Sequence, residues 1–322
     1  MKIGIYYSYW EHEWRGDYHR HIDRVADLGF DILELSCASL PTDRAELISL
    51  RDHARDRGIS LTGGHGPGVN ASLCSDDPAI VSNAKAELTG HLKQLELLDA
   101  HVVGGGLYSY WPVDYNRPFD KARDWANAVR NVREMSFVAA DHGVTLALEV
   151  LNRFEGYLIN TSAECRRFVE EVDHPNTGIM LDTFHMNIEE DSFAGAIRTA
   201  GNLLKHVHLG EANRRVPGKG RLPWREIGNA LNEIGYDGAC VMEPLSCRAA
   251  PSVSRFVSGG SWSRMYPSRL WTQTQKSPSS LCAICLKRSE FSFLFQPPGR
   301  LVRAACYFFF LTIYPKLYIK SI

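Results

Sequence analysis

Four residues with metal-ligand side chains each lie at the end of a short apolar run, and such runs recur along the chain. The runs TLALEV, TGIMLD, KHVHLG and GACVME carry Glu149, Asp182, His208 and Glu243, at intervals of 33, 26 and 35 residues. Apolar runs of this length are typical of parallel strands buried on both faces, and strand–helix units recur at about this spacing. The pattern predicts repeated strand–helix units with ionisable groups at the strand ends.

Further runs of the same kind occupy the rest of the chain up to residue 245. Eight strands are expected, at residues 3–7, 32–35, 60–63, 102–105, 145–150, 178–182, 206–209 and 239–242. Amphipathic segments such as 43–57 and 77–98 separate them, and Thr161 to Glu164 has the pattern of a capping box at a helix start. Eight strands that alternate with helices over this length predict a single (β/α)8 TIM barrel.

The main alternative fold is a doubly wound open sheet, which binds dinucleotides at a glycine-rich turn after its first strand. The chain lacks such a turn after its expected first strand. The glycines at 104–106 follow a later strand and do not have the dinucleotide spacing. Glycines at a strand end let a ligand or another backbone approach closely, so they fit the mouth of a barrel equally well. The barrel is therefore the preferred fold.

In such a barrel, the C-terminal ends of the strands converge on one mouth, where catalytic groups collect. Three carboxylates in one poorly solvated pocket would repel one another and take up protons unless a cation neutralised them. For Glu149 the alternative is an ion pair with Arg153 or Lys205 at the rim. However, Glu149 is the only charged residue in the apolar run LALEV. The four groups therefore predict a metal-dependent enzyme.

The net charge of −1 conceals an uneven distribution of charge along the chain. Residues 246–322 contain eleven Lys or Arg and one acidic residue, Glu290, which leaves 25 basic and 36 acidic residues in the first 245. The expected catalytic part is therefore strongly acidic. An acidic surface disfavours a nucleic-acid partner, because binding the phosphate backbone requires basic residues.

The chain ends and the cysteines bear on where the protein is located. The N-terminal residues MKIGIYYSYWEHEW are charged and aromatic, unlike a signal peptide, and the apolar run at 304–314 is too short to span a bilayer. The eight cysteines show no disulfide framework in their spacing. We therefore expect a cytoplasmic protein with reduced thiols and no membrane partner.

The character of the sequence changes near residue 246. Thirteen of the last 77 residues are serine, aspartate is absent, and no helical periodicity persists. A barrel requires a helix after its eighth strand to cover the sheet between the last and first strands. We therefore expect residues 1–246 to form the catalytic barrel and residues 247–322 to be an atypical basic, Ser-rich tail. This tail would replace the last helix region and would be disordered or the product of a reading-frame change.

Several motifs in residues 1–245 resemble one known family. These are GIYYSYWEHEW, SYWPVDY, EVLNRFE, MLDTFHMNIEEDSF, GEANRRVPGKGR and the final MEP. They are similar to the D-tagatose 3-epimerase / D-psicose (allulose) 3-epimerase family of the xylose-isomerase-like TIM barrels. The resemblance implies inversion at C3 of free ketohexoses, which interconverts D-fructose with D-psicose and D-tagatose with D-sorbose. It also implies a homo-oligomer, a dimer or a tetramer.

The resemblance also implies roles for individual residues. A divalent metal, most typically Mn²⁺ with Co²⁺ or Mg²⁺ as alternatives, would be held by Glu149, Asp182, His208 and Glu243. Removing the C3 proton of a ketose gives a cis-enediolate, and inversion requires one base on each face of that carbon. Glu149 and Glu243 are expected to be these two bases. The residues expected to contact the substrate are Tyr6, Trp111, Glu155, His185 and Arg214, with His185 in the loop after its strand.

His206 and His208 lie on the same face of their strand, so either could bind the metal. Position and resemblance both favour His208, which leaves His206 as a hydrogen-bonded histidine inside the barrel.

The chain departs from the family pattern at a few positions. Leu245 follows MEP where the family usually has Phe, Leu209 follows the ligand His where Thr is common, and His65 stands where an apolar residue is usual. These differences bear on substrate preference and rate rather than on the class of reaction. The larger departure is the tail, in which the family's final helix has no recognisable counterpart.

Two other functions remain open from the sequence. One is a metal-dependent aldose–ketose isomerase or hydroxypyruvate isomerase on the same barrel. A hydride shift of the xylose isomerase kind is disfavoured, because no lysine lies at the strand ends that carry the expected ligands. The other is an inactive product that lacks the closing helix.

Overall fold

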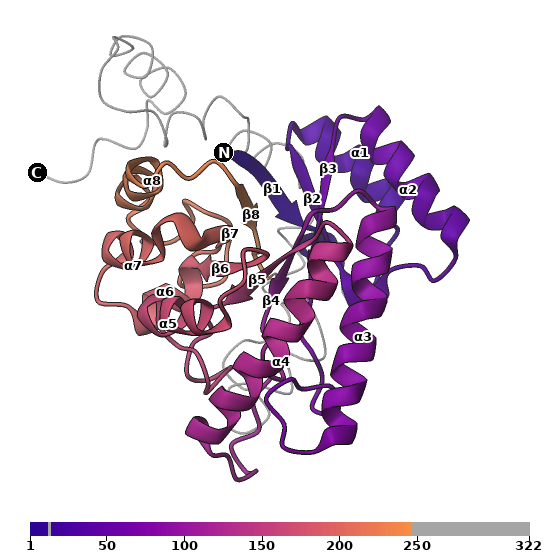
Figure 1. Ribbon diagram of the computed structural model, residues 1–322. Coiled ribbons are helices and arrows are strands. Elements are labelled where there is room, and N and C mark those ends of the chain that lie inside the picture. Colours follow the sequence, from indigo (N-terminus) through magenta and orange to yellow (C-terminus); the bar gives the residue numbers. More distant parts are fainter. Residues whose placement is uncertain (12–13, 246–322) are drawn as a thin grey trace, which may run out of the picture.

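The computed structural model describes residues 1–11 and 14–245, which form a closed barrel of eight parallel strands surrounded by helices (Figure 1). Each strand pairs with the next along the chain, and β1 closes the barrel against β8, with Lys2 opposite Ala239. The strands are β1 (Lys2–Tyr6), β2 (Ile32–Ser36), β3 (Ser60–Gly64), β4 (Val102–Gly105), β5 (Thr145–Glu149), β6 (Thr177–Asp182), β7 (Leu204–Leu209) and β8 (Ala239–Met242). The predicted TIM barrel and its eight strands are confirmed.

The helices alternate with the strands, as the amphipathic segments predict. They are α1 (Tyr18–Leu28), α2 (Arg44–Asp56), α3 (Pro78–Leu97), α4 (Lys121–Asp141), α5 (Ser162–Val172), α6 (Thr183–Glu189), α7 (Phe193–Ala200) and α8 (Trp224–Glu233), with short 3-10 turns at Tyr7–Trp10, Cys37–Ser39 and Gly201–Leu203. Each helix start that the sequence indicated has an oxygen cap. The Asp43, Asp77 and Thr161 side chains accept hydrogen bonds from the first turns of α2, α3 and α5.

Apolar side chains fill the interior because parallel strands in a barrel are covered on both faces. All five residues of β2 and all six of β6 are buried. Around the barrel, one stripe of each helix packs inward; on α3 it consists of Ala84, Leu88, Leu92 and Leu95. Burial of this two-sided kind is what allows runs such as ILELS and TGIMLD to form strands.

The register of the sheet places the strand ends that carry ionisable groups next to one another. Asp182 on β6 lies opposite His208 on β7, and Leu209 lies opposite Met242, the residue before Glu243. Where β5 pairs with β6, Glu149 lies opposite Met180, which comes two residues before Asp182 on β6. The backbone ladder, rather than any loop, therefore brings these groups to the C-terminal mouth of the barrel.

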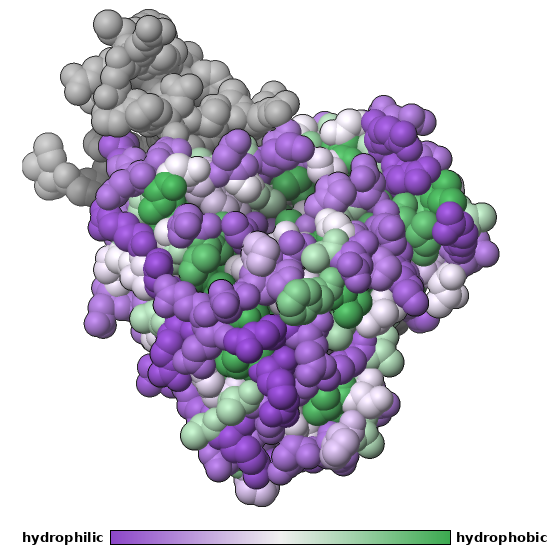
Figure 2. All heavy atoms as spheres, viewed as in Figure 1, coloured by the Kyte–Doolittle hydropathy of each residue, from purple (hydrophilic) through white to green (hydrophobic). Residues whose placement is uncertain are grey.

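On the face shown in Figure 2, hydrophobic side chains are scattered among hydrophilic ones. Among the described helices, none combines the length and the apolar character needed to cross a membrane. The four cysteines in this part of the chain, Cys37, Cys74, Cys165 and Cys240, are buried free thiols. The predicted boundary at residue 246 and the predicted tail at 247–322 lie outside the described residues.

Candidate metal centre and surrounding pocket

The four predicted ligands meet at the mouth of the barrel. Glu149 ends β5, Asp182 ends β6 and caps α6, His208 is the last residue but one of β7, and Glu243 directly follows β8. Ligand atoms of Glu149, Asp182 and His208 all lie within 4.8 Å of one another. Glu243 joins this group through His208, whose Nδ1 lies 3.4 Å from Glu243 Oε2. The structure therefore assembles three carboxylates and one imidazole around one point.

The two glutamates differ in their electrostatic surroundings. Burial raises the pKa of Glu149 well above its usual range, and the nearby Glu243 and Asp182 carboxylates raise it further. Burial also opposes ionisation of Glu243, but the neighbouring His208 and Arg214 outweigh it and lower the pKa of that carboxyl. The cluster thus holds one glutamate that resists ionisation beside one that favours it, as like charges in a dry pocket require.

A divalent metal fits this set of residues. His208 Nδ1 is buried and has no hydrogen-bond partner within residues 1–11 and 14–245, although it faces Glu243. One imidazole nitrogen together with three carboxylates is a typical ligand set for Mn²⁺, Co²⁺ or Zn²⁺. The predicted alternative for Glu149 does not occur, because Arg153 pairs with Glu189 at 2.8 Å and Lys205 Nζ donates to the Asn202 carbonyl.

Arg214 brings a positive charge to the same cluster. Its Nη1 donates to Asp182 Oδ2 at 2.8 Å and to Glu243 Oε2 at 3.1 Å, and the guanidinium lies over the Phe184 ring. The Arg214 backbone adopts a left-handed conformation, with φ of 55°. A non-glycine residue in that region carries strain, and such residues are concentrated at functional sites. Arg214 is therefore held at the carboxylates by the loop after β7.

His185 lies in the first turns of α6 and not in a loop, which corrects the prediction from sequence. The helix begins directly after Asp182, so three residues further on the His185 ring faces back over the strand ends. Its Nδ1 accepts from the Asn152 side chain at 2.6 Å, and its Nε2 lies 3.6 Å from both Glu149 Oε1 and Asp182 Oδ2. Burial lowers the pKa of His185 to about 3. The ring is therefore a neutral donor that points Nε2–H toward the cluster.

A cavity of about 540 Å³ opens beside the metal-ligand cluster. It is lined by all five residues predicted to contact the substrate, Tyr6, Trp111, Glu155, His185 and Arg214, and by Glu149, His208 and Glu243. Trp111 Nε1 donates to Glu155 Oε2 at 3.0 Å, and Asn152 Nδ2 donates to Glu155 Oε1 at 2.9 Å. The pocket thus combines aromatic walls with fixed polar groups, as sites for small polar ligands do.

Sequence reasoning missed Glu34, which lies beneath the cluster in the middle of β2. Its Oε1 accepts from His208 Nε2 at 2.6 Å, its Oε2 lies 2.7 Å from His206 Nε2, and Thr62 donates to the same oxygen at 2.7 Å. Because His208 uses Nε2 to reach Glu34, its Nδ1 is left to face the other carboxylates. The sequence does contain a sign of this role, because Glu34 is the only charged residue in the buried run ILELS. His206 lies inside the barrel, as predicted.

Asn152 is a second residue that the sequence did not single out. It holds His185 and Glu155 together through one side-chain amide. Nothing in its local sequence distinguishes it from an ordinary loop asparagine, because its role depends on the position of α6.

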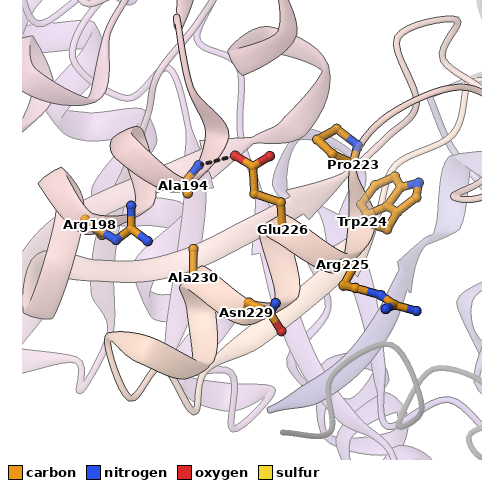
Figure 3. Close-up of a pocket in the computed structure, with 8 residues that line it drawn as sticks. All are labelled: Ala194, Arg198, Pro223, Trp224, Arg225, Glu226, Asn229 and Ala230. Atoms are coloured by element: carbon orange, nitrogen blue, oxygen red, sulfur yellow. Dashed lines mark hydrogen bonds between the residues drawn. The ribbon is translucent and has the colours of Figure 1, made fainter. Parts of the chain in front are cut away.

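A second cavity, of about 600 Å³, lies on the outside of the barrel between α7 and α8 (Figure 3). Its lining includes Arg198, Trp224 and Glu226, and the Glu226 carboxylate accepts from the Ala194 backbone. None of the predicted site residues lines it. The chemistry of the strand ends therefore belongs to the pocket at the mouth.

Comparisons with known proteins agree with this geometry. The family described as a xylose isomerase-like TIM barrel matches residues 22–256. The chain is 57% identical over 246 residues to the D-psicose 3-epimerase of Ruminiclostridium cellulolyticum, which covers 76% of this chain and 84% of that protein. A crystal structure of D-psicose 3-epimerase with D-tagatose from Clostridium cellulolyticum H10 superposes with a TM-score of 0.82 and 48% identity, covering 92% of this chain and 100% of that one. Another crystal structure, of D-psicose 3-epimerase in the presence of D-fructose, superposes with a TM-score of 0.78 and 50% identity. The match covers 81% of this chain and 92% of that one.

Proposed function

Because this chain belongs to the xylose isomerase-like TIM barrel family, and within it to the D-psicose 3-epimerases, we propose that it is an isomerase that inverts C3 of free ketohexoses. The observation that carries the proposal is the convergence of Glu149, Asp182, His208 and Glu243 beside a pocket lined by all five predicted substrate residues. The named sugars of the solved relatives, D-fructose and D-tagatose, are the substrate class that we propose.

Glu149, Asp182, His208 and Glu243 are the residues that would hold a divalent metal. The ion that we propose is Mn²⁺, with Co²⁺ or Mg²⁺ as alternatives. When bound, such an ion supplies a Lewis acid that stabilises negative charge on the sugar oxygens beside the reacting carbon.

Glu149 and Glu243 would perform the proton transfers. Glu149 ends β5 and Glu243 directly follows β8, so the two lie on either side of the strands that carry Asp182 and His208. One glutamate takes the C3 proton, which leaves the sugar as a cis-enediolate, and the other returns a proton to the opposite face of C3. The reaction is reversible, so each group acts as base in one direction and as acid in the other. The pKa values of the two groups are already displaced in opposite directions.

The remaining pocket residues would bind and orient the sugar. The neutral His185 ring and the Arg214 guanidinium offer donors to sugar oxygens next to the cluster. Glu155 is fixed by Trp111 and Asn152 and offers an acceptor to a hydroxyl group. Tyr6 and Trp111 are apolar walls that would lie against C–H bonds and exclude water from the enediolate.

An aldose–ketose isomerase on the same barrel is not favoured, because three relatives at 53–57% identity are named D-psicose 3-epimerases. We further propose a cytoplasmic homo-oligomer, a dimer or a tetramer, whose catalytic barrel ends near residue 246. Sedimentation velocity of the full chain would test the oligomeric state.

The decisive experiment is product analysis after Mn²⁺ is added back to chelated enzyme, with D-fructose, D-tagatose and L-ribulose as substrates. We expect the C3 epimer of each accepted ketose to form, and solvent deuterium to enter at C3. Glu149→Gln serves as the matched control for contaminating activity. Formation of an aldose with deuterium at C2, together with exchange of a C1 proton of the ketose, would contradict the proposal and favour the isomerase.

A further inference from the structure

A second cluster of histidine and carboxylate side chains lies between α3 and the loop that follows β3. It consists of His65 from the loop and of Glu87 and His91, which lie one turn apart on α3. His65 Nε2 lies 3.2 Å and His91 Nε2 lies 3.9 Å from the same oxygen, Glu87 Oε1, and ligand atoms of the three residues are all within 4.8 Å of one another. None of these residues belongs to the ligand set at the mouth.

The protonation pattern of His91 is set by its neighbours. Gln94 Nε2 donates to the Pro41 carbonyl at 3.0 Å, which fixes the amide and leaves Gln94 Oε1 as an acceptor. His91 Nδ1 lies 3.2 Å from that oxygen and therefore carries the proton. The neutral ring is the form that binds a metal, and in it the other nitrogen carries no proton. His91 Nε2 is consequently left with a bare lone pair.

Without a metal, the lone pair of His91 Nε2 faces another hydrogen-bond acceptor and not a donor. His91 Nε2 is buried, has no hydrogen-bond partner in the described part of the chain, and faces the carboxylate of Glu87. Two lone pairs that face each other repel, and a buried acceptor without a donor costs free energy. A cation between His65, Glu87 and His91 would remove both penalties at once.

We propose that His65, Glu87 and His91 form a second site, which binds a divalent transition-metal ion of the zinc class. Two imidazoles and one carboxylate suit Zn²⁺, Co²⁺ or Ni²⁺ and not the oxygen-seeking Ca²⁺ or Mg²⁺. In a tetrahedral site with bonds of about 2.0–2.1 Å, neighbouring ligand atoms lie roughly 3.3–3.4 Å apart. The distances of 3.2 and 3.9 Å from Glu87 Oε1 need only a small side-chain adjustment to reach this value.

The surroundings of the cluster fit this role. Gln94 accepts from His91 Nδ1, which is the usual outer contact of a metal-binding histidine. The Glu87 side chain is 41% exposed, so an ion can enter from solvent and keep a water molecule as its fourth ligand.

A metal at this site would join α3 to the wall of the substrate pocket. The backbone N–H of His65 donates to the Gly104 carbonyl, and the Pro67 carbonyl accepts from the Trp111 N–H. Gly64 at the end of β3, and His65 and Gly66 of the loop, line the pocket, as Trp111 does. The ion would thus fix a loop that positions Trp111, and its effect would be structural, on stability and loop order.

Zinc stoichiometry of the full-length protein tests the proposal, measured by equilibrium dialysis with elemental analysis. We expect two equivalents of Zn²⁺ in the unmodified chain, one in His91→Gln and one in Glu87→Gln. The matched control is His142→Gln, which removes a histidine that also pairs with a glutamate, Glu96. It should retain two equivalents.

A thermal-shift measurement separates loss of the site from loss of the fold. The second equivalent should raise the melting temperature of the unmodified chain and of His142→Gln, but not that of Glu87→Gln, whose exposed side chain leaves the core intact. A single equivalent in the unmodified chain, or two equivalents in both His91→Gln and Glu87→Gln, would overturn the proposal. Neither outcome tests the proposed epimerase activity, which is assigned to the residues at the mouth.

Discussion

The two histidine–carboxylate clusters of this protein use the same side-chain types on different foundations. At the mouth, the ligands stand on four neighbouring strands whose register is fixed by the barrel, with Asp182 directly opposite His208. At α3, two of the three residues share one helical face and the third comes from a loop. Strand ends of a closed barrel converge on a dry pocket, whereas a helix face remains open to solvent. The arrangement at the mouth suits a catalytic metal site, and the arrangement at α3 suits a metal site that stabilises the structure.

The two clusters also differ in how deeply their carboxylates are buried. The Asp182 side chain is completely buried, whereas that of Glu87 is 41% exposed. Charges at the mouth therefore interact strongly with one another, while those at α3 are partly screened by water. We expect changes at the mouth to affect turnover by orders of magnitude and changes at α3 to affect only stability.

Removal of metal should have the largest effect. Chelation should abolish turnover, and Mn²⁺ or Co²⁺ should restore it better than Ca²⁺, because the mouth offers three carboxylates and one imidazole in a compact group. Metal should also raise the melting temperature, since it neutralises crowded carboxylates and binds only the folded state. Assays of chelated and reconstituted enzyme check this. Full activity of metal-free enzyme would contradict the assignment of the mouth as a metal-dependent catalytic site.

Glu149→Gln and Glu243→Gln should come next, each lowering turnover by roughly 10²–10⁴-fold, the usual contribution of a positioned acid or base. A variant that still binds metal should exchange the C3 proton of one epimer with solvent, because one face keeps its base. Rates and deuterium incorporation measure the two effects. A loss below about tenfold in both variants would be too small for a catalytic acid or base, and the assigned roles would then be wrong.

The sequence predicted the barrel well because its signals are local. Runs such as TLALE and TGIMLD are buried on both faces, and caps such as Asp43 and Asp77 mark helix starts within a few residues of chain. The strand-end rule then located all four mouth residues. The same rule missed Glu34, because that residue lies in the middle of its strand and its partners on β7 are 172 and 174 residues further along the chain.

Residues whose role depends on distant packing could not be found from the sequence. Asn152 acts through a helix 33 residues away, and His185 was expected in a loop although α6 begins directly after β6. The α3 cluster was missed for the same reason. In the sequence, nothing near His65 connects it with Glu87 and His91, which lie 22 and 26 residues later in a segment whose pattern indicates only an amphipathic helix.

Glu34→Gln should have an intermediate effect. The amide has one carbonyl oxygen and cannot accept hydrogen bonds from both His206 and His208, as the carboxylate does. The His208 ring is therefore held less firmly in its orientation. Outer contacts of this kind typically change metal affinity by about 10–100-fold. Calorimetric titration with Mn²⁺ measures the change, and Glu190→Gln, a carboxylate that accepts from the Ser162 backbone away from the cluster, is the control. Unchanged affinity would mean that the strand register alone positions His208.

Trp111→Phe should have a smaller effect on catalysis. The ring wall is largely kept, but Glu155 loses the donor that holds its Oε2 at 3.0 Å. A hydrogen bond to a charged group contributes about 1.5–3 kcal/mol, of which the second contact from Asn152 preserves a part. We expect KM for the ketose to rise by about tenfold with kcat changed less. A fall in kcat at constant KM would place Trp111 in the chemistry and not in substrate binding.

The smallest effect should come from Glu87→Gln in the presence of chelator. The hydrogen bond from His65 lowers the pKa of Glu87 despite its partial burial, so the ionised carboxylate is the form that the fold stabilises. A lowered folded pKa gives stability that is present above the unfolded pKa, about 4.3, and is lost as the pH falls through the folded value. Since the group is partly exposed, the contribution should stay below about 1 kcal/mol. Urea unfolding from pH 7 down to about pH 3 should therefore show a small deficit in the variant that shrinks once the pH falls below about 4.3. A deficit of several kcal/mol, or one that grows with acid, would mean that the α3 cluster is as strongly coupled as the mouth.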